Sequence, residues 1–379
     1  MTEAEAMAVL VSAVPGYGRR ERLLRAAGSA AALLADPYAY AEISEDGAAA
    51  LREAVRRSDD FLDSLRMHGT QLILKDAEGW PSRLSEIRCP PHLLFCQGLA
   101  DLTDAVMVAG VGTRDASPYG LRMARRIVRD LAQQGVCVVS GLALGIDAAC
   151  HQGALDAGGR TVAVLGGALD RFYPRENRPL MERIVAEGGS VVTEYAPGVA
   201  PTRYSFLSRN RIIAGMSLGV FVAEGRQRSG ALSTAVSALE EGREVFALPG
   251  NVDEPRAALP NRLITEGAKL VTCAQDILAE LVIEPGSEKP EKKRRKPARP
   301  KPIIKEEKAP EASVPASLGA EEQAVCRAVL PDGADYDEVC EKTGIPSETL
   351  GSLLIEMEMD GFVEMLPGNR IGPGPTLYR

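Results

Sequence analysis

The sequence predicts an α/β protein built around an extended Rossmann-like, doubly wound parallel sheet, with a smaller helical module before it and a winged helix after it. Short apolar runs alternate with helical patterns through the middle of the chain, which is typical of buried parallel strands joined by helices. The length of 379 residues exceeds one ordinary core and favours several domains. We expect a helical module, a Rossmann-like domain, a linker and a winged-helix domain, at residues 1–70, 71–283, 284–317 and 318–379.

Residues 1–70 are rich in Ala, Leu and Arg and predict short helices of a SAM-like or helix–hairpin–helix-like module. Within them Val14 to Gly18 reads Val-Pro-Gly-Tyr-Gly, which resembles a helix–hairpin–helix turn. Such a turn exposes backbone N–H groups that can hold a phosphate. Packing of a small helical module explains the same residues at least as well.

Six apolar runs of three to six residues predict the core strands of the Rossmann-like domain. They are residues 106–111, 136–139, 161–165, 190–192, 218–222 and 245–248. Helical patterns fall between most of them, so a right-handed, mostly parallel sheet follows.

The C-terminal part combines a basic linker with an acidic domain. Residues 284–317 mix Lys and Arg with repeated Pro, a composition typical of an extended or disordered segment. This linker is either an electrostatic tether for nucleic acid or a solvated spacer. Residues 318–379 predict helices at 321–330, 336–343 and 347–360 and then a hairpin wing, turning at 367–369.

Charge is unevenly distributed. From Ala320 to Arg379 there are twelve acidic and four basic residues, so this segment carries the whole net charge of −8. The third helix of the winged helix, where recognition residues usually lie, contains four acids and no Lys or Arg. We therefore expect this domain to contact protein rather than duplex DNA.

Composition argues against several classes of protein. Seven scattered Cys without a CxxC motif disfavour a disulfide framework or a thiolate zinc site, and three dispersed His disfavour a histidine metal site. No apolar run is long enough for a membrane span, and the N-terminal sequence lacks the features of a secretory signal. We expect a cytoplasmic protein with no metal and no cofactor.

Glycine-rich turns follow several predicted strands, at the edge where open parallel sheets bind ligands. One contains Gly112, Thr113 and Arg114, where an Arg stands in place of a complete GxGxxG fingerprint and favours phosphate over a nicotinamide cofactor. Others begin at Ser140-Gly141, Gly166-Gly167 and Ser229-Gly230. Together they predict a binding cleft.

The segment 201–211 is the densest mixture of basic and aromatic residues in a chain that is only 4% aromatic. It offers Arg203 and Phe206, the combination of cation and stacking ring that binds single-stranded nucleic acid. For Arg209 and Arg211, pairing with acids inside the fold is an equally good interpretation.

Six segments taken in order resemble the DNA-processing protein A (DprA/Smf) family. They are GWPSRLSEIRCPPHLLFCQG, VAGVGTRDASPYG, VVSGLALGIDAACHQGAL, GGRTVAVLGGALDRFYPREN, FLSRNRIIAG and EVFALPGN, and they span residues 80 to about 280. The resemblance implies a homodimer that binds and protects incoming single-stranded DNA and loads the RecA recombinase during natural transformation.

Carried over to this chain, the resemblance places Gly112, Thr113 and Arg114 in a phosphate pocket. It makes Arg203 and Phe206 the basic and base-stacking positions, and Asn210 and Arg211 part of an RNR motif. Ser140, Gly141, Ser229 and Gly230 complete the expected DNA-binding set. A departure from the family is Leu144, where an Arg is frequent, so one cation is missing.

A rival hypothesis is a LOG-like nucleotide-processing hydrolase that uses the glycine-rich cleft. Enzymes of that kind carry a glutamate soon after a GGxGT segment, whereas here Thr234 is followed by Ala235 and Val236. No carboxylate would then stabilise an oxocarbenium-like centre. We predict a binding protein without catalytic residues.

Overall fold

The computed structural model describes most of the chain as two compact units, Met1–Ile277 and Leu278–Arg379. The described residues are 1–14, 16–103, 106–227, 229–281, 314–315, 318–330, 333–359, 361–366 and 370–378. The expected linker at 284–317 lies outside them, apart from residues 314–315.

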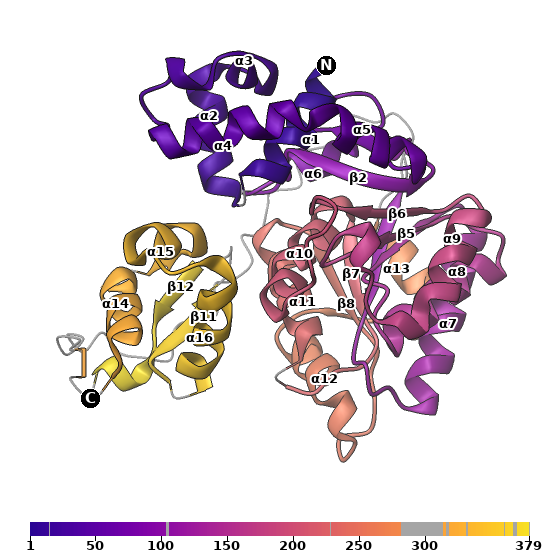
Figure 1. Ribbon diagram of the computed structural model, residues 1–379. Helices are drawn as coiled ribbons and strands as arrows, with labels where there is room; N and C mark the ends of the chain where they lie inside the picture. The colour runs from indigo at the N-terminus through magenta and orange to yellow at the C-terminus, as the bar shows by residue number, and fades with distance from the viewer. Residues whose placement is uncertain are drawn as a thin grey trace, which may run out of the picture. The chain divides into compact units, whose positions relative to one another are not determined.

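The first unit is organised around a nine-stranded sheet in the order β1-β2-β6-β5-β4-β3-β7-β8-β9 (Figure 1). Its strands are β1 Gln71–Leu74, β2 Leu93–Gly98, β3 Met107–Val111, β4 Cys137–Ser140, β5 Thr161–Val164, β6 Ser190–Thr193, β7 Gly219–Val222, β8 Glu244–Ala247 and β9 Lys269–Leu270. Pairing is parallel from β6 across to β9, and antiparallel for β1 with β2 and for β2 with β6. The Rossmann-like, mostly parallel sheet is thus confirmed, and all six expected strands are present.

Helices cover both faces of this sheet. The crossovers β3–β4, β4–β5 and β5–β6 step in one direction along the sheet, and the crossovers β6–β7, β7–β8 and β8–β9 step in the other. Right-handed connections therefore place the two sets of helices on opposite faces. One face carries α7 Pro118–Gln133, α8 Ile146–Asp156 and α9 Arg178–Ala186. The other carries α10 Arg203–Met216, α11 Gly230–Glu240, α12 Ala258–Thr265 and the short α6 Ser82–Ser85. The helix α13 Ala274–Glu280 follows β9.

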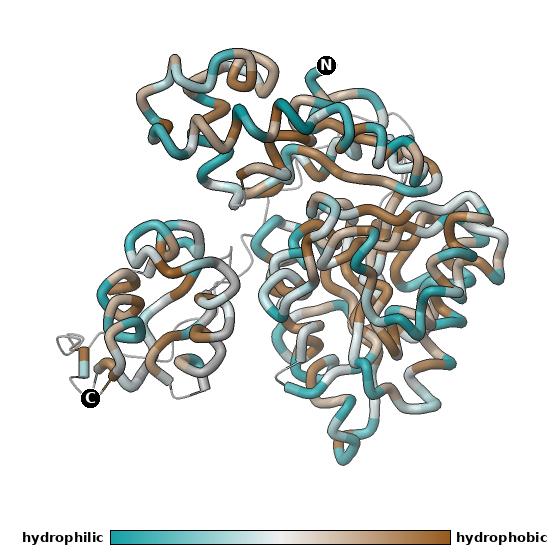
Figure 2. Tube along the Cα trace, viewed as in Figure 1, coloured by the Kyte–Doolittle hydropathy of each residue, from teal (hydrophilic) through white to brown (hydrophobic). Residues whose placement is uncertain are grey.

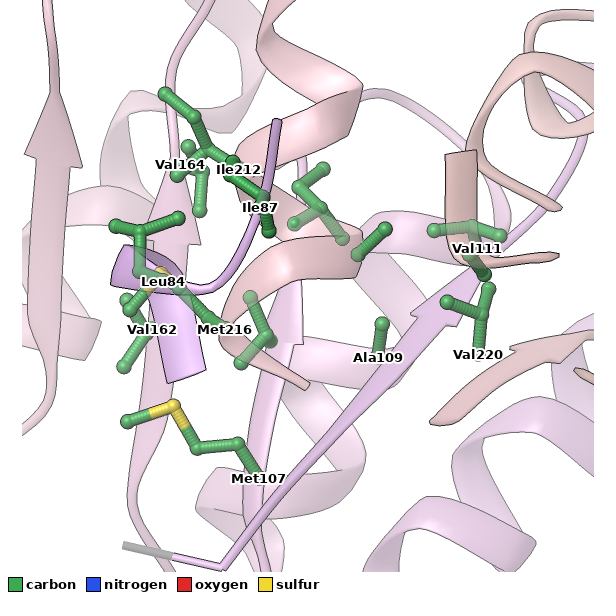
Figure 3. Close-up of a cluster of buried hydrophobic side chains, with 14 of the residues drawn as sticks. Leu84, Ile87, Met107, Ala109, Val111, Val162, Val164, Ile212, Met216 and Val220 are labelled. Carbon is green, nitrogen blue, oxygen red and sulfur yellow. The ribbon is translucent and has the colours of Figure 1, made fainter. Parts of the chain in front are cut away.

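The core of the second face is built from strand and helix side chains together. Ile212 and Met216 of α10 pack with Leu84 and Ile87 over the sheet, where Met107 and its neighbours complete the cluster (Figure 3). Every residue of β3, β4, β5, β6 and β7 is buried, which explains why these strands are continuous apolar runs in the sequence. The same strands form the hydrophobic interior in Figure 2.

The N-terminal helices have a core of their own. They are α1 Glu3–Ala13, α2 Tyr17–Ala27, α3 Ala30–Ala35, α4 Glu45–Arg56 and α5 Ser58–Met67. Their buried side chains pack with Leu93 and Phe95 of β2, while Leu94 and Cys96 of the same strand belong to the sheet core. Alternate residues of β2 therefore face two different cores.

The second unit contains the helices and hairpin of a winged helix. Its elements are α14 Ala320–Val329, β10 Ala334–Asp335, α15 Tyr336–Thr343, α16 Ser347–Met359, β11 Val363–Leu366 and β12 Arg370–Pro373. The strands β11 and β12 pair antiparallel, and β10 pairs with β12. The expected wing is therefore confirmed, although its turn at 367–369 lies outside the described residues.

Short 3-10 turns complete the described structure, at Pro37–Ala39, Leu169–Arg171, Arg175–Asn177, Pro255–Ala257 and Pro375–Tyr378. Within the described part of the chain, none of the helices has the length and apolar character needed to cross a membrane.

Candidate functional site

The carboxyl edge of the parallel strands gathers the glycine-rich turns. Because β5, β4, β3 and β7 are parallel neighbours, the turns that follow them emerge side by side. The helix α10 begins at the same edge, since it follows β6 and its Ser205 hydroxyl donates to the carbonyl oxygen of Gly166 after β5.

The turn between β3 and α7 is held by Glu224, which is only 3% exposed. The Thr113 N–H donates to the Glu224 carbonyl oxygen at 2.8 Å, and the Ser117 N–H donates to the carboxylate at 2.8 Å. Gly112 is required here because a Cβ would lie 2.6 Å from Ile146 and 2.8 Å from the Glu224 carbonyl oxygen. The first turn of α7, expected as an anion site, is thus already occupied by the chain's own carboxylate.

The next turn, between β4 and α8, also encloses a carboxylate. Asp147 is buried and accepts hydrogen bonds from the N–H groups of Gly112, Gly141 and Ala143. Burial raises the pKa of Asp147, while nearby Arg209 and these N–H groups oppose that rise. This second internal anion was not predicted from the sequence.

Ser140 and Gly141, which were expected to contact DNA, have interior roles instead. The Ser140 hydroxyl is fully buried and donates to the Gly110 carbonyl oxygen at 2.6 Å. A Cβ on Gly141 would lie 2.6 Å from the Arg209 guanidinium and 2.7 Å from the Asp147 carboxylate. Both residues shape the turn beneath the surface.

The outer rim of the edge carries a cluster of one cation and two rings. The Arg114 guanidinium carbon lies 5.3 Å from the centroid of the Phe206 ring, a cation–π geometry. On the same ring Tyr173 packs at 6.1 Å between centroids, and it remains 52% exposed. We name Arg114, Phe206 and Tyr173 the rim cluster.

Arg114 is exposed, and among the described residues no carboxylate oxygen lies within 4.0 Å of its guanidinium. Its charge is therefore available to a ligand. Tyr173 was not among the expected site residues, although its place in the basic-aromatic segment 171–175 was a signal for it.

The local sequence fixes the position of Phe206. Thr202 caps α10 in a reciprocal capping box with Ser205, so the helix start is well defined. The Phe206 ring lies against Gly166, where a Cβ would approach it to 2.7 Å. Arg203, in the first turn of the same helix, is exposed as expected.

The remaining residues of the RNR motif turn inward. Arg209 is 5% exposed and donates to the carbonyl oxygens of Gly141, at 2.9 Å, and Val164. Arg211 forms an ion pair with Glu194 at 2.6 Å, and both side chains are largely buried. Asn210 donates to the Gly230 carbonyl oxygen at 3.3 Å and to Ser233 at 3.4 Å. Asn210 and Arg211 therefore hold α10 in place, so we leave them out of the ligand-facing set.

The turn before α11 is more open. Gly230 is exposed, and a Cβ there would meet no atom within 4 Å. The Ser229 hydroxyl oxygen is buried without a hydrogen-bond partner. This turn emerges at the same edge as the other three. Among the described residues, it makes no contact with the rim cluster.

The described residues contain no group of three or more His, Cys, Asp or Glu side chains that could hold a metal ion. His151 is fully buried, its Nδ1 lies 2.7 Å from the Thr161 hydroxyl, and burial lowers its pKa to about 3. It has no access to the edge of the sheet.

Comparison with known families agrees with this architecture. Residues 71–282, more than half of the chain, match the family described as DNA recombination-mediator protein A, and residues 308–369 match the DprA winged helix domain. The chain belongs to the DprA/Smf family. The resemblance noted in the sequence is thereby confirmed.

Members of the DprA/Smf family from distant bacteria are similar over much of their length. The DNA processing protein DprA of Streptococcus pneumoniae is 47% identical over 208 residues, which are 55% of this chain and 72% of that relative. Protein Smf of Escherichia coli is 36% identical over 322 residues, or 84% and 81% of the two chains.

Two solved structures of the DprA/Smf family share the fold. The X-ray structure of DprA from Streptococcus pneumoniae aligns with a TM-score of 0.63 and 37% identity, and the alignment covers 74% of this chain and 98% of that chain. DprA from Helicobacter pylori, whose structure is described as giving insight into its single-stranded DNA binding mode, aligns with a TM-score of 0.50 and 30% identity over 56% of this chain and 95% of that chain.

Proposed function

We propose that this protein binds single-stranded DNA at the carboxyl edge of its sheet, with bases stacking on the rim cluster and phosphates meeting Arg114 and Arg203. The observation that carries the proposal is the exposed Arg114 guanidinium over the Phe206 ring, with Tyr173 on the same ring. Cations beside stacking rings are the usual means of holding single strands without sequence preference. The single-stranded DNA binding of the relative from Helicobacter pylori supports the same interpretation.

The contribution of the glycine turns differs from that of the rim. Gly112 and Thr113 position Arg114, because their backbones are fixed on Glu224 and Asp147. Ser229 and Gly230 border the edge at the start of α11, where the Ser229 side chain makes no capping hydrogen bond, so we propose them as secondary phosphate contacts.

A fluorescence-anisotropy titration with labelled single-stranded and duplex oligonucleotides at two salt concentrations tests this proposal. We expect tight, salt-sensitive binding that prefers the single strand and is weakened by Arg114→Ala. Equal affinity for duplex, or affinity that Arg114→Ala leaves unchanged, would contradict it.

We further propose, from membership in the family, that the protein acts in the bacterial cytoplasm as a homodimer that protects incoming DNA and loads RecA onto it during natural transformation. Light scattering of the purified chain measures the dimer. Loading is measured as the lag before RecA begins to hydrolyse ATP on DNA covered by single-strand-binding protein. The full chain should shorten this lag.

The acidic winged helix fits protein contacts better than duplex DNA, because its third helix carries acids alone among its charged residues. A chain ending at residue 317, which keeps the basic linker and lacks the winged helix, should therefore bind duplex DNA no more weakly than the full chain. Loss of duplex affinity in the shorter chain would contradict this assignment.

The rival hydrolase hypothesis requires a carboxylate that is available at the glycine-rich edge, and Glu224, the candidate at the β3–α7 turn, is not available. The Glu224 carboxylate is buried and accepts hydrogen bonds from Ser117, so it is engaged in capping α7. Release of free base from a nucleoside monophosphate by the purified chain would favour hydrolysis over the binding function.

A further inference from the structure

The solvent face of α7 carries an arginine stripe, defined by Arg122, Arg125, Arg126 and Arg129. All four side chains are exposed. At 3.6 residues per turn, these positions fall within an arc of about 100° and extend about 10 Å along the helix. The opposite side of α7 is buried, through Ala124, Ile127, Val128 and Leu131, so the stripe faces outward by construction.

Few negative charges balance this stripe. The helix α7 carries four Arg against one acid, Asp130, while α9 carries two Arg and one Glu, and α8 carries two Asp and no Lys or Arg. Among the described residues, no carboxylate oxygen lies within 4.0 Å of Arg122 or Arg126. Those two positions therefore keep an uncompensated charge.

The other two arginines have partly exposed carboxylate partners. Arg125 pairs with Asp156 at 2.6 Å and Arg129 pairs with its chain neighbour Asp130 at 2.9 Å, and both arginine side chains are about half exposed. Exposed ion pairs of this kind contribute little to stability. A phosphate can exchange with these carboxylates at low cost.

The stripe begins about one helical turn into α7, the element that follows the Arg114 loop. The helix α7 starts at Pro118, four residues after Arg114, and its first turn is fixed to the edge of the sheet through Ser117 and Glu224. A polyanion leaving the rim at Arg114 therefore meets Arg122 first and then Arg126 and Arg129 along the helix. Between Arg122 and Arg129 the sequence holds no aromatic residue, so this surface offers charge without base stacking.

We propose that the arginine stripe of α7 is a second DNA contact, which binds the phosphodiester backbone of the strand after it leaves the rim cluster. This inference rests on the proposed function, because it extends the path of the same strand. In this arrangement the rim cluster contacts bases as well as phosphates and the stripe contacts phosphates alone, so the stripe should contribute affinity only to strands long enough to reach it.

The test compares two lengths of single-stranded DNA, about six and about thirty nucleotides, the shorter within the range of a single binding site. The double variant Arg122→Gln and Arg126→Gln keeps helix-forming side chains and alters only exposed positions. For the longer strand we expect affinity to fall on the order of tenfold at about 0.1 M salt, and the slope of log affinity against log salt to decrease by about 1.4. Affinity for the shorter strand should not change.

A matched control neutralises two exposed arginines on α4 of the helical module, Arg52→Gln and Arg56→Gln, with the same change in net charge. This control should bind both lengths as the unaltered chain does, and all variants should unfold at the same temperature. Equal losses in the control and the stripe variant would overturn the proposal, because net charge alone would then explain them.

The remaining outcomes separate the stripe from the rim. Equal weakening of both lengths by the stripe variant would overturn the proposed path. Unchanged DNA binding with slower RecA loading would assign the stripe to an acidic protein surface and overturn the DNA contact. Failure of the unaltered chain to bind either length would overturn the proposed function itself, and the inference with it.

Discussion

At the carboxyl edge of the sheet, the inner turns and the outer rim both use arginine, but to different ends. Inside, Arg209 is buried, donates to two carbonyl oxygens and lies near the buried Asp147. Outside, Arg114 is exposed and lies over an aromatic ring, and among the described residues no carboxylate oxygen lies within 4.0 Å of its guanidinium. Burial, rather than residue type, decides which arginine serves the fold and which is available to a ligand.

The same comparison applies to negative charge. Glu224 and Asp147 occupy the N-terminal turns of α7 and α8, the places where a Rossmann-like fold otherwise holds an anionic ligand. Because the protein's own carboxylates occupy these inner anion sites, the rim is the part of the edge that remains for a phosphate of the ligand. The following changes test this division, beginning with the largest expected effect.

Arg209→Ala should destabilise the fold most, because it leaves Asp147 buried without its nearby cation. Loss of one partner of a buried charged pair costs about 3–5 kcal/mol of unfolding free energy. Denaturant unfolding followed by circular dichroism measures this loss. Arg203→Ala changes an exposed residue on the same helix, so its unfolding free energy should stay within about 0.5 kcal/mol of that of the unaltered chain. A similar loss of stability in the two variants would contradict the division between inner turns and rim.

Phe206→Ala should weaken single-strand binding by about 1–3 kcal/mol, the contribution of stacking to one base. Since stacking is not ionic, the dependence of affinity on salt should remain the same. Titrations at several salt concentrations measure both quantities, and Phe206→Trp is the matched variant that should retain affinity. A reduced salt slope in Phe206→Ala would mean that the ring acts mainly by holding Arg114.

Arg114→Gln should lower affinity about fivefold at about 0.1 M salt and reduce the salt slope by about 0.7, as expected for one lost phosphate contact to a single strand. The same titrations measure the effect. Arg52→Gln serves as its control, being an exposed arginine on α4. Identical behaviour of the two variants would remove Arg114 from the interface.

The smallest effect is expected for the clamp on the Arg114 loop. Arg256 donates to the Asp115 carbonyl oxygen at 2.6 Å and to its carboxylate at 2.9 Å, so it holds the residue next to Arg114. Arg256→Ala and Asp115→Ala change the charge in opposite directions, yet both should lower affinity about threefold by loosening the loop. Opposite effects on affinity would show that charge, and not positioning, dominates here.

This clamp also predicts a flat pH response. The hydrogen bond from Arg256 holds the pKa of Asp115 below its usual value of 3.8. A depressed carboxyl pKa means that the clamp is intact above the usual value and is lost only as the pH falls through the depressed one. The contribution of Asp115 to affinity should therefore stay constant between about pH 5 and 8. Titrations of the unaltered chain and of Asp115→Ala across that range measure this contribution as the difference between their affinities.

The strands buried on both faces were predictable because burial leaves a direct trace in the sequence. The strand β3, for example, is an unbroken apolar run. The strands β1, β2 and β9 were not predicted, since β1 and β9 are edge strands with exposed residues and β2 follows a proline-rich stretch. Local sequence identified Arg114, in a glycine turn after a predicted strand, and Phe206, in the basic-aromatic segment 201–211, as ligand-facing candidates. It could not separate them from Arg211, because its partner Glu194 is brought near only by the fold.

The two-sided strand β2 has a consequence for how the molecule can be divided. Leu93 and Phe95 close the core of the N-terminal helices from below, as Leu72 and Leu74 of β1 help to do. Cutting the chain before Gln71 would therefore strip the cover from an apolar face instead of releasing an independent module. A cut after Gly98 would in turn remove Leu94 and Cys96 from the sheet core, so β2 ties the helical module and the sheet into one body that no single cut on either side of the strand separates cleanly.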